Sequence, residues 1–155
     1  MIAGVAIAAI ATLTLLKPAP EVRFTALSGE TFSTSGLRGK VVLVNFWASY
    51  CGSCVREMPR IADTHAKFAP RGYETIAVAV SKDDPARVAS FARAHVLPFP
   101  VVIDDGTAAK QFGNVRLTPT TFLIDKQGRV LRRYVGEPDW AELHRLVEKA
   151  LENSI

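Results

Sequence analysis

The chain has few residues of the kinds that hold metals, with two cysteines and three histidines among 155 residues. A structural zinc site uses four ligands, usually two closely spaced pairs of cysteine or histidine. Cys51 and Cys54 form one such pair, but His65, His95 and His144 are scattered along the sequence. Two cysteines also exclude a disulfide scaffold, which a chain of this length does not need in order to fold. We therefore expect no bound metal.

A strong charge of one sign is also absent. The sequence has 19 Lys and Arg against 15 Asp and Glu, for a net charge of +4. The basic residues alternate with acidic ones, whereas a nucleic-acid site needs basic residues gathered on one face or groove. We therefore expect no nucleic-acid binding.

Charged side chains are missing from residues 1–16, MIAGVAIAAIATLTLL. A helix of that length would span roughly 24 Å, somewhat less than the ~30 Å hydrocarbon core of a bilayer. The segment lacks the basic start and the small-residue cleavage site of a secretory signal. We expect an uncleaved membrane anchor, with a cleaved signal as the alternative. Residues 17–20, which include Pro18 and Pro20, are expected to form a linker, and residues 21–155 a single domain.

The remaining sequence alternates between strand and helix patterns. The run VVLVNFWA at 41–48 is continuously apolar, as in a strand buried on both faces, and a helical pattern follows from Cys54. Asp84 and Asp139 are expected to cap helices, and Lys126 to Gly128 to form a hairpin turn. The order predicts an α/β fold in which a central mixed β-sheet carries helices on both faces. The other predicted strands lie within 21–40, 73–80, 99–104 and 120–136, and a further short helix lies at 106–113.

The two cysteines form a Cys-x-x-Cys motif directly after the buried strand and at a helix start. This context is typical of a redox motif. The free N–H groups and the dipole at a helix start stabilise a thiolate, so Cys51, the outer cysteine, is predicted to be the nucleophile. Cys54 is predicted to resolve the mixed disulfide. Binding of Cu(I) by the two thiolates, as in a metallochaperone, is an alternative, and the motif does not decide between a reductase and an oxidase.

Two stretches together resemble the thioredoxin superfamily, and more closely its TlpA- and ResA-like extracytoplasmic branch. They are VVLVNFWASYCGSCVREMP at 41–59 and LTPTTFLIDKQGRV at 117–130. The resemblance runs from about Glu21 to the C-terminus, and it implies a thioredoxin-like fold with an N-terminal β extension and a central insertion at 81–115. It also implies a set of site residues: Trp47, Thr118 and Pro119 (the last in a cis peptide bond) for substrate binding, and Cys51, Cys54 and Glu57 for catalysis.

Glu57 carries particular weight in this comparison. Cytosolic thioredoxins usually have a buried aspartate where this chain has Asn45. We therefore expect Glu57 to take over proton transfer and to tune the pKa of the thiols, although an acid in the first turn of a helix also has an ordinary role in favouring the helix dipole.

The resemblance implies an enzyme, a protein disulfide oxidoreductase that needs no organic cofactor. We expect it to reduce disulfides of exported proteins, such as apocytochrome c or metal-site assembly proteins, with electrons from a membrane donor. The positive charges that follow residues 1–16 would favour a cytoplasmic location. The resemblance instead places the catalytic domain, expected to be a monomer, on the periplasmic side of the membrane.

Overall fold

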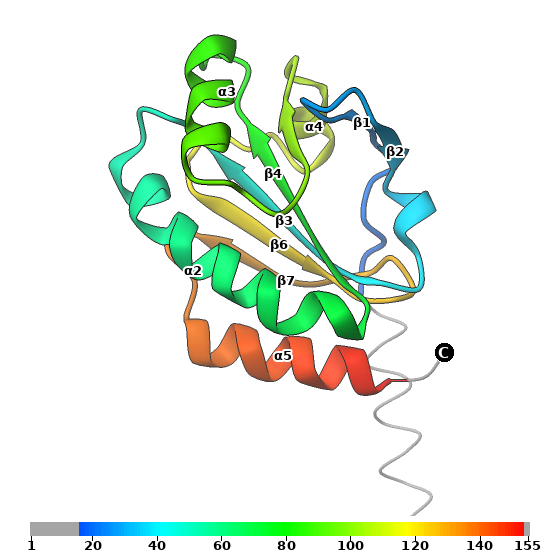
Figure 1. The fold of residues 1–155 in the computed structure, drawn as a ribbon. Helices are drawn as coiled ribbons and strands as arrows, with labels where there is room; N and C mark the ends of the chain where they lie inside the picture. Colours follow the sequence, from blue (N-terminus) through cyan, green and yellow to red (C-terminus); the bar gives the residue numbers. More distant parts are fainter. Residues whose placement is uncertain (1–15, 154–155) are drawn as a thin grey trace, which may run out of the picture.

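A computed structural model describes residues 16–153 of the chain (Figure 1). The expected membrane segment, residues 1–16, lies outside the described residues except for its last position. Within 16–153, no helix is both long enough and apolar enough to cross a bilayer.

The core of the domain is a five-stranded sheet in the order β5-β4-β3-β6-β7. Strand β3 (Val41–Trp47) lies at its centre, and all seven of its residues are buried, as the continuous apolar run predicts. Strands β4 (Tyr73–Ala79) and β5 (Val101–Ile103) run parallel to it. Strands β6 (Thr120–Ile124) and β7 (Val130–Val135) form the predicted antiparallel hairpin. The expected mixed sheet is therefore confirmed.

Helices cover both faces of this sheet. Helices α2 (Gly52–Phe68), α3 (Pro85–Ala94) and α5 (Trp140–Glu152) pack over the face that carries Val41, Leu43 and Trp47. The opposite face is covered by the short helix α4 (Thr107–Gln111) and by the hairpin of β1 (Arg23–Thr25) and β2 (Thr31–Ser33). Figure 1 shows α2 and α5 side by side. Two short 3-10 helices, η1 (Ser35–Leu37) and η2 (Ala69–Arg71), complete the elements.

Predicted caps hold two of these helices. The carboxylate of Asp84 accepts a hydrogen bond from the backbone N–H of Ala86, and that of Asp139 accepts one from Glu142, so both predicted N-caps are confirmed. The expected linker segment lies along the turn between β6 and β7, because the N–H of Ala19 donates to the carbonyl of Gly128.

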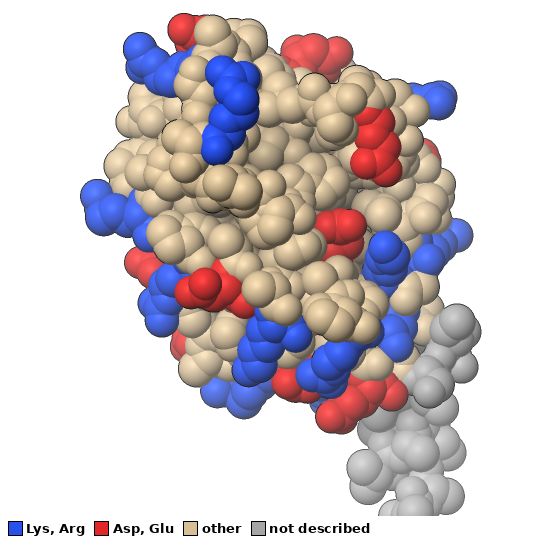
Figure 2. Space-filling view, viewed as in Figure 1, with Lys and Arg blue, Asp and Glu red and all other residues tan. Residues whose placement is uncertain are grey.

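Charges of both signs are mixed on the face formed by α2 and α5. Figure 2 shows Lys and Arg side chains interspersed with Asp and Glu over these helices, with no continuous stripe of one sign. Ion pairs account for part of this mixing, since Arg60 lies 3.7 Å from Glu137 and Arg71 lies 2.7 Å from Glu148. This face therefore offers no concentrated charge of one sign to a partner.

Candidate active site

The two cysteines meet at the start of α2, where they form a disulfide with their Cα atoms 5.2 Å apart. Cys51 is the N-cap of the helix, and its sulfur lies 3.3 Å from the backbone nitrogen of Cys54, from which it accepts a hydrogen bond. The helix begins at Gly52, so the predicted helix start at the cysteine pair is confirmed. The Cys51 sulfur thus accepts a hydrogen bond from the Cys54 N–H, one of the N–H groups that lack a backbone partner at a helix start. The same N–H is placed to stabilise a Cys51 thiolate.

The two sulfurs differ in their access to solvent. Cys54 is completely buried, whereas Cys51 is partly exposed. The Cys51 sulfur lies 3.5 Å from the hydroxyl of Ser53 and 3.6 Å from the carbonyl oxygen of Thr118. A substrate can therefore reach Cys51 but not Cys54, and this favours Cys51 as the attacking sulfur.

The loop before β6 faces this sulfur. The peptide bond between Thr118 and Pro119 is cis, and Pro119 is buried. Its carbonyl accepts a hydrogen bond from the N–H of Gly136 at 2.8 Å, and the hydroxyl of Thr120 donates to the carbonyl of Leu117 at 2.6 Å. These bonds hold the Thr118 carbonyl beside Cys51, so the structure brings together two segments that are 67 residues apart in the chain.

Glu57 lies on the buried side of α2, one helical turn after Cys54, and is 2% exposed. The side-chain amide of Asn45 donates to one of its carboxyl oxygens at 3.1 Å and to the hydroxyl of Thr121 at 3.0 Å. The other carboxyl oxygen has no hydrogen-bond partner among residues 16–153.

Burial raises the pKa of Glu57 from 4.5 to about 7. The hydrogen bond from Asn45 opposes this rise, and the negative charge of Glu137 adds to it. A carboxyl group with this pKa can both give and take a proton at neutral pH. Sequence analysis anticipated the residue, while the partnership with Asn45 and Thr121 comes from the structure.

Trp47 lies in the core of the domain. It is completely buried at the end of β3, and its ring packs against Phe91 of α3 with 5.1 Å between ring centroids. Its side chain points to the face of the sheet that α2 and α3 cover. The contacts that the structure gives Trp47 are packing contacts within the core, and its expected contact with substrate stays a prediction.

Sequence analysis missed Asp83, which anchors the cysteine loop. This buried carboxylate accepts hydrogen bonds from the N–H and the hydroxyl of Ser49, each at 2.6 Å, and from the N–H of Asp84 at 2.8 Å. Ser49 lies two residues before Cys51. The sequence has two aspartates, Asp83 and Asp84, before Pro85, and Asp84 alone caps α3. The second aspartate, which the cap does not need, was the signal that could have identified Asp83.

Replacing Asp83 by Asn should destabilise the domain. In the variant, an NH₂ group replaces one carboxylate oxygen and faces the N–H and O–H donors that Asp83 now accepts from. The variant also lacks the negative charge that strengthens the hydrogen bonds of Asp83. We expect the free energy of unfolding in urea to fall by about 1–3 kcal/mol. The matched control is Asp63→Asn, at an exposed position of α2, which should leave it nearly unchanged. Equal stability of the wild type and Asp83→Asn would show that Asp83 does not anchor the loop.

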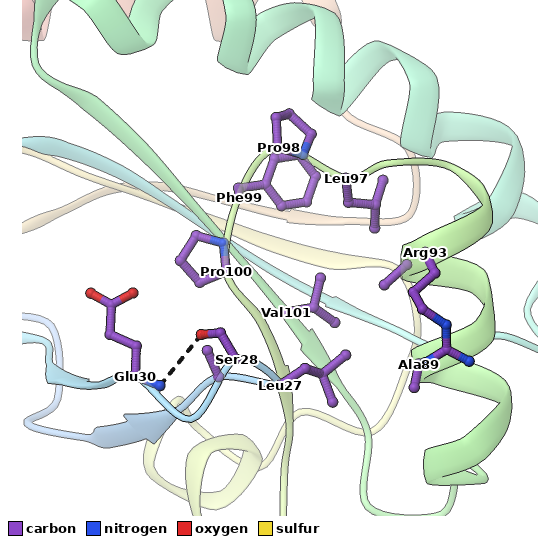
Figure 3. A pocket seen from close by; sticks show the side chains of 12 residues that line it. Leu27, Ser28, Glu30, Ala89, Arg93, Leu97, Pro98, Phe99, Pro100 and Val101 are labelled. Carbon is purple, nitrogen blue, oxygen red and sulfur yellow. Dashed lines mark hydrogen bonds between the residues drawn. The ribbon is translucent and has the colours of Figure 1, made fainter.

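A cavity of about 680 Å³ lies away from the cysteines, between α3, the segment 97–101 and the turn after β1. Figure 3 shows its apolar floor, formed by Leu97, Phe99 and Val101, with Glu30 and Arg93 on opposite sides. Its lining contains no cysteine or histidine. Across residues 16–153, no cluster of three or more His, Cys, Asp or Glu side chains could hold a metal ion. The chemistry of the described residues therefore centres on the two cysteines.

Comparisons with known proteins agree with this geometry. The family model described as Redoxin matches residues 16–151. The thiol-disulfide oxidoreductase ResA of Bacillus anthracis is 36% identical over 133 residues, which are 86% of this chain and 76% of that protein. ResA of Bacillus subtilis (strain 168) is 32% identical over 126 residues, or 81% of this chain and 70% of that one. A crystal structure of a thiol:disulfide interchange protein of the thioredoxin family, from Chlorobium tepidum TLS, matches with a TM-score of 0.80 and 29% identity, covering 88% of this chain and 97% of the other.

Proposed function

The chain belongs to the Redoxin family and is a ResA-like thiol-disulfide oxidoreductase of the thioredoxin superfamily, and from this premise we propose that it reduces disulfides in exported proteins. One observation carries the proposal: an accessible Cys51 sulfur lies beside the Thr118 carbonyl, with a buried Cys54 directly behind it. This arrangement suits a peptide substrate that approaches from one side and a second thiol that attacks from the other.

The reaction proceeds by two exchanges. The Cys51 thiolate attacks one sulfur of the substrate disulfide, a mixed disulfide forms, and the other substrate sulfur leaves as a thiolate that takes up a proton. The Cys54 thiolate then attacks the Cys51 sulfur, which forms the Cys51–Cys54 disulfide and releases the second substrate thiol. The substrate gains two electrons and two protons, and the protein loses the same number. A dithiol donor at the membrane restores the reduced pair.

Glu57 is the candidate proton acceptor for the second exchange. Cys54 is buried, so water cannot readily remove its proton. Glu57 lies one turn further along the same buried helix face, and its raised pKa allows a carboxylate to take that proton near neutral pH. Asn45 holds the carboxyl group in place through its 3.1 Å hydrogen bond.

We also propose that residues 1–16 anchor the protein in a membrane, with the catalytic domain on the extracytoplasmic side. The absence of charged side chains from this segment supports an anchor. The similarity to ResA-like proteins supports the orientation, because reduction by a dedicated protein is needed where the cytosolic reducing pools are absent. The same similarity supports our proposal that the substrates are exported proteins with disulfides, including apocytochrome c. It also supports a membrane protein as the electron donor. We propose that the domain acts as a monomer and without nucleic acid.

Mixing the pre-reduced protein with a protein disulfide tests the proposal. We expect substrate thiols to appear while an equal amount of the Cys51–Cys54 pair becomes oxidised, as measured by thiol alkylation and mass spectrometry. A parallel titration with Cu(I) tests the metallochaperone alternative, since two thiolates are soft ligands. Tight stoichiometric copper binding without any disulfide exchange would contradict the proposed function.

A further inference from the structure

A groove of about 450 Å³ adjoins the reactive sulfur. Its lining includes residues 80–82, which follow β4, Ala109 of α4, and Val115, Arg116 and Thr118. Tyr50, the residue before Cys51, also lines it and is 58% exposed. Because the Thr118 carbonyl lies 3.6 Å from the Cys51 sulfur, the groove begins where a substrate disulfide must lie.

The lining of this groove carries positive charge alone. It includes Lys82 and Arg116, both exposed, and no Asp or Glu. Neither cation takes part in an ion pair or a hydrogen bond of its side chain within the part of the chain that the structure describes. Some other basic residues of the domain are paired, as Arg71 is with Glu148 and Arg132 with Glu142.

Among residues 16–153, the carboxylates that lie near Lys82 and Arg116 in the sequence or on the adjoining loop form no ion pair with either cation. Asp83 is buried and accepts hydrogen bonds from Ser49. Asp84 accepts one from the N–H of Ala86, and Asp105 one from the N–H of Thr107. Each of these carboxylates therefore has a hydrogen-bond donor other than Lys82 or Arg116, and the two cations remain available to an anion from outside.

We propose that this groove selects protein disulfides in which an acidic side chain lies next to the attacked cysteine. The inference rests on the proposed function and specifies its substrate class. With the substrate sulfur on Cys51, the neighbouring residues of the substrate pass Thr118 and enter the groove, where a carboxylate lies between Lys82 and Arg116. Complementary charge of this kind raises the rate of productive encounter and suppresses wrong partners.

Two short peptides test the inference, each with one internal disulfide and with either Glu or Gln on both sides of the first cysteine. The measurement is kcat/KM for their reduction by the protein, at low salt and again at about 1 M salt, where charges are screened beyond roughly 3 Å. Reduction by dithiothreitol corrects for the intrinsic reactivity of each disulfide. We expect the wild type to prefer the Glu peptide by about threefold to tenfold at low salt. The preference should approach one at high salt.

The double variant Lys82→Gln/Arg116→Gln should lose the preference and reduce the two peptides at nearly equal rates. The control Arg23→Gln/Lys40→Gln removes the same charge from exposed positions outside the groove, and it should keep the preference. Equal rates for the two peptides with the wild type, or a preference that survives in the groove variant, would overturn the inference and leave the proposed function intact. Reduction of neither peptide would overturn both.

Discussion

Replacing Cys54 by Ser should leave a protein that attacks a disulfide once and then stops. The Cys51 thiolate still forms a mixed disulfide, but no second thiol is present to release it, because the chain has only two cysteines. Turnover should fall by roughly a thousandfold or more. The measurement is the recovery of covalent adducts through Cys51 on non-reducing gels, from cells and from mixtures with a purified protein disulfide.

The reciprocal substitution gives the control for this trap. Cys51→Ser retains only the buried Cys54, so it should lose turnover to the same degree and form almost no adduct. Adducts formed equally by both variants would mean that Cys54 is accessible and that the two roles are not divided. A Cys54→Ser protein that forms no adduct with any protein would exclude protein disulfides as substrates.

Replacing Glu57 by Gln should make the domain more stable at alkaline pH. Burial raises the pKa of Glu57 from 4.5 to about 7. Between pH 4.5 and about 7, Glu57 is therefore protonated in the folded state but ionised in the unfolded state. The stabilisation from the protonated carboxyl group is complete below pH 4.5 and is lost as the pH rises through about 7. At about 1.4 kcal/mol per pKa unit, the loss is about 3 kcal/mol by about pH 8.

The measurement is the free energy of unfolding in urea at several pH values, compared between wild type and Glu57→Gln. The glutamine has nearly the same shape and can accept the hydrogen bond from Asn45, so the two proteins should have similar stability below about pH 4.5. Their stabilities should diverge as the pH rises from 4.5 to about 7, and the difference should stay nearly constant at higher pH. Burial lowers the pKa of His65 and of His144, but both histidines are present in both proteins and cancel in the difference. A difference that does not change with pH would show that Glu57 has an ordinary pKa.

The same variant tests the catalytic role of the carboxyl group. If Glu57 exchanges protons with Cys54, Glu57→Gln should shift the pH profile of thiol alkylation in the reduced protein. A changed stability profile with an unchanged alkylation profile would leave Glu57 a buried acid without influence on the thiols.

The parts of the fold that follow from local pattern could be predicted from the sequence. The apolar run at 41–48 has the composition of a strand that is buried on both faces, which is typical of the centre of a sheet. Asp84 followed by Pro85 is typical of a helix start. The helix start at the cysteine pair was also predicted, although the sulfur of Cys51 as the cap comes from the structure. The cysteine pair itself was identified from spacing and context.

The parts that depend on contacts distant in the chain could not be predicted in this way. Trp47 precedes the cysteine loop, but only the positions of α2 and α3 decide that its side chain is buried. Asp83 lies 34 residues from Ser49 in sequence, and only the parallel arrangement of β3 and β4 brings them together. The groove of Lys82 and Arg116 likewise joins two segments that no motif connects.

The reduction potential of the Cys51–Cys54 couple tests the central claim most directly. It is measured by equilibrating the protein with glutathione or dithiothreitol buffers and alkylating the free thiols. A reductase should have a potential near that of thioredoxin, roughly −270 mV, so that electrons flow from the protein to its substrates. A potential near that of the oxidant DsbA, roughly −120 mV, would mean that the pair introduces disulfides and would contradict the proposed reductase.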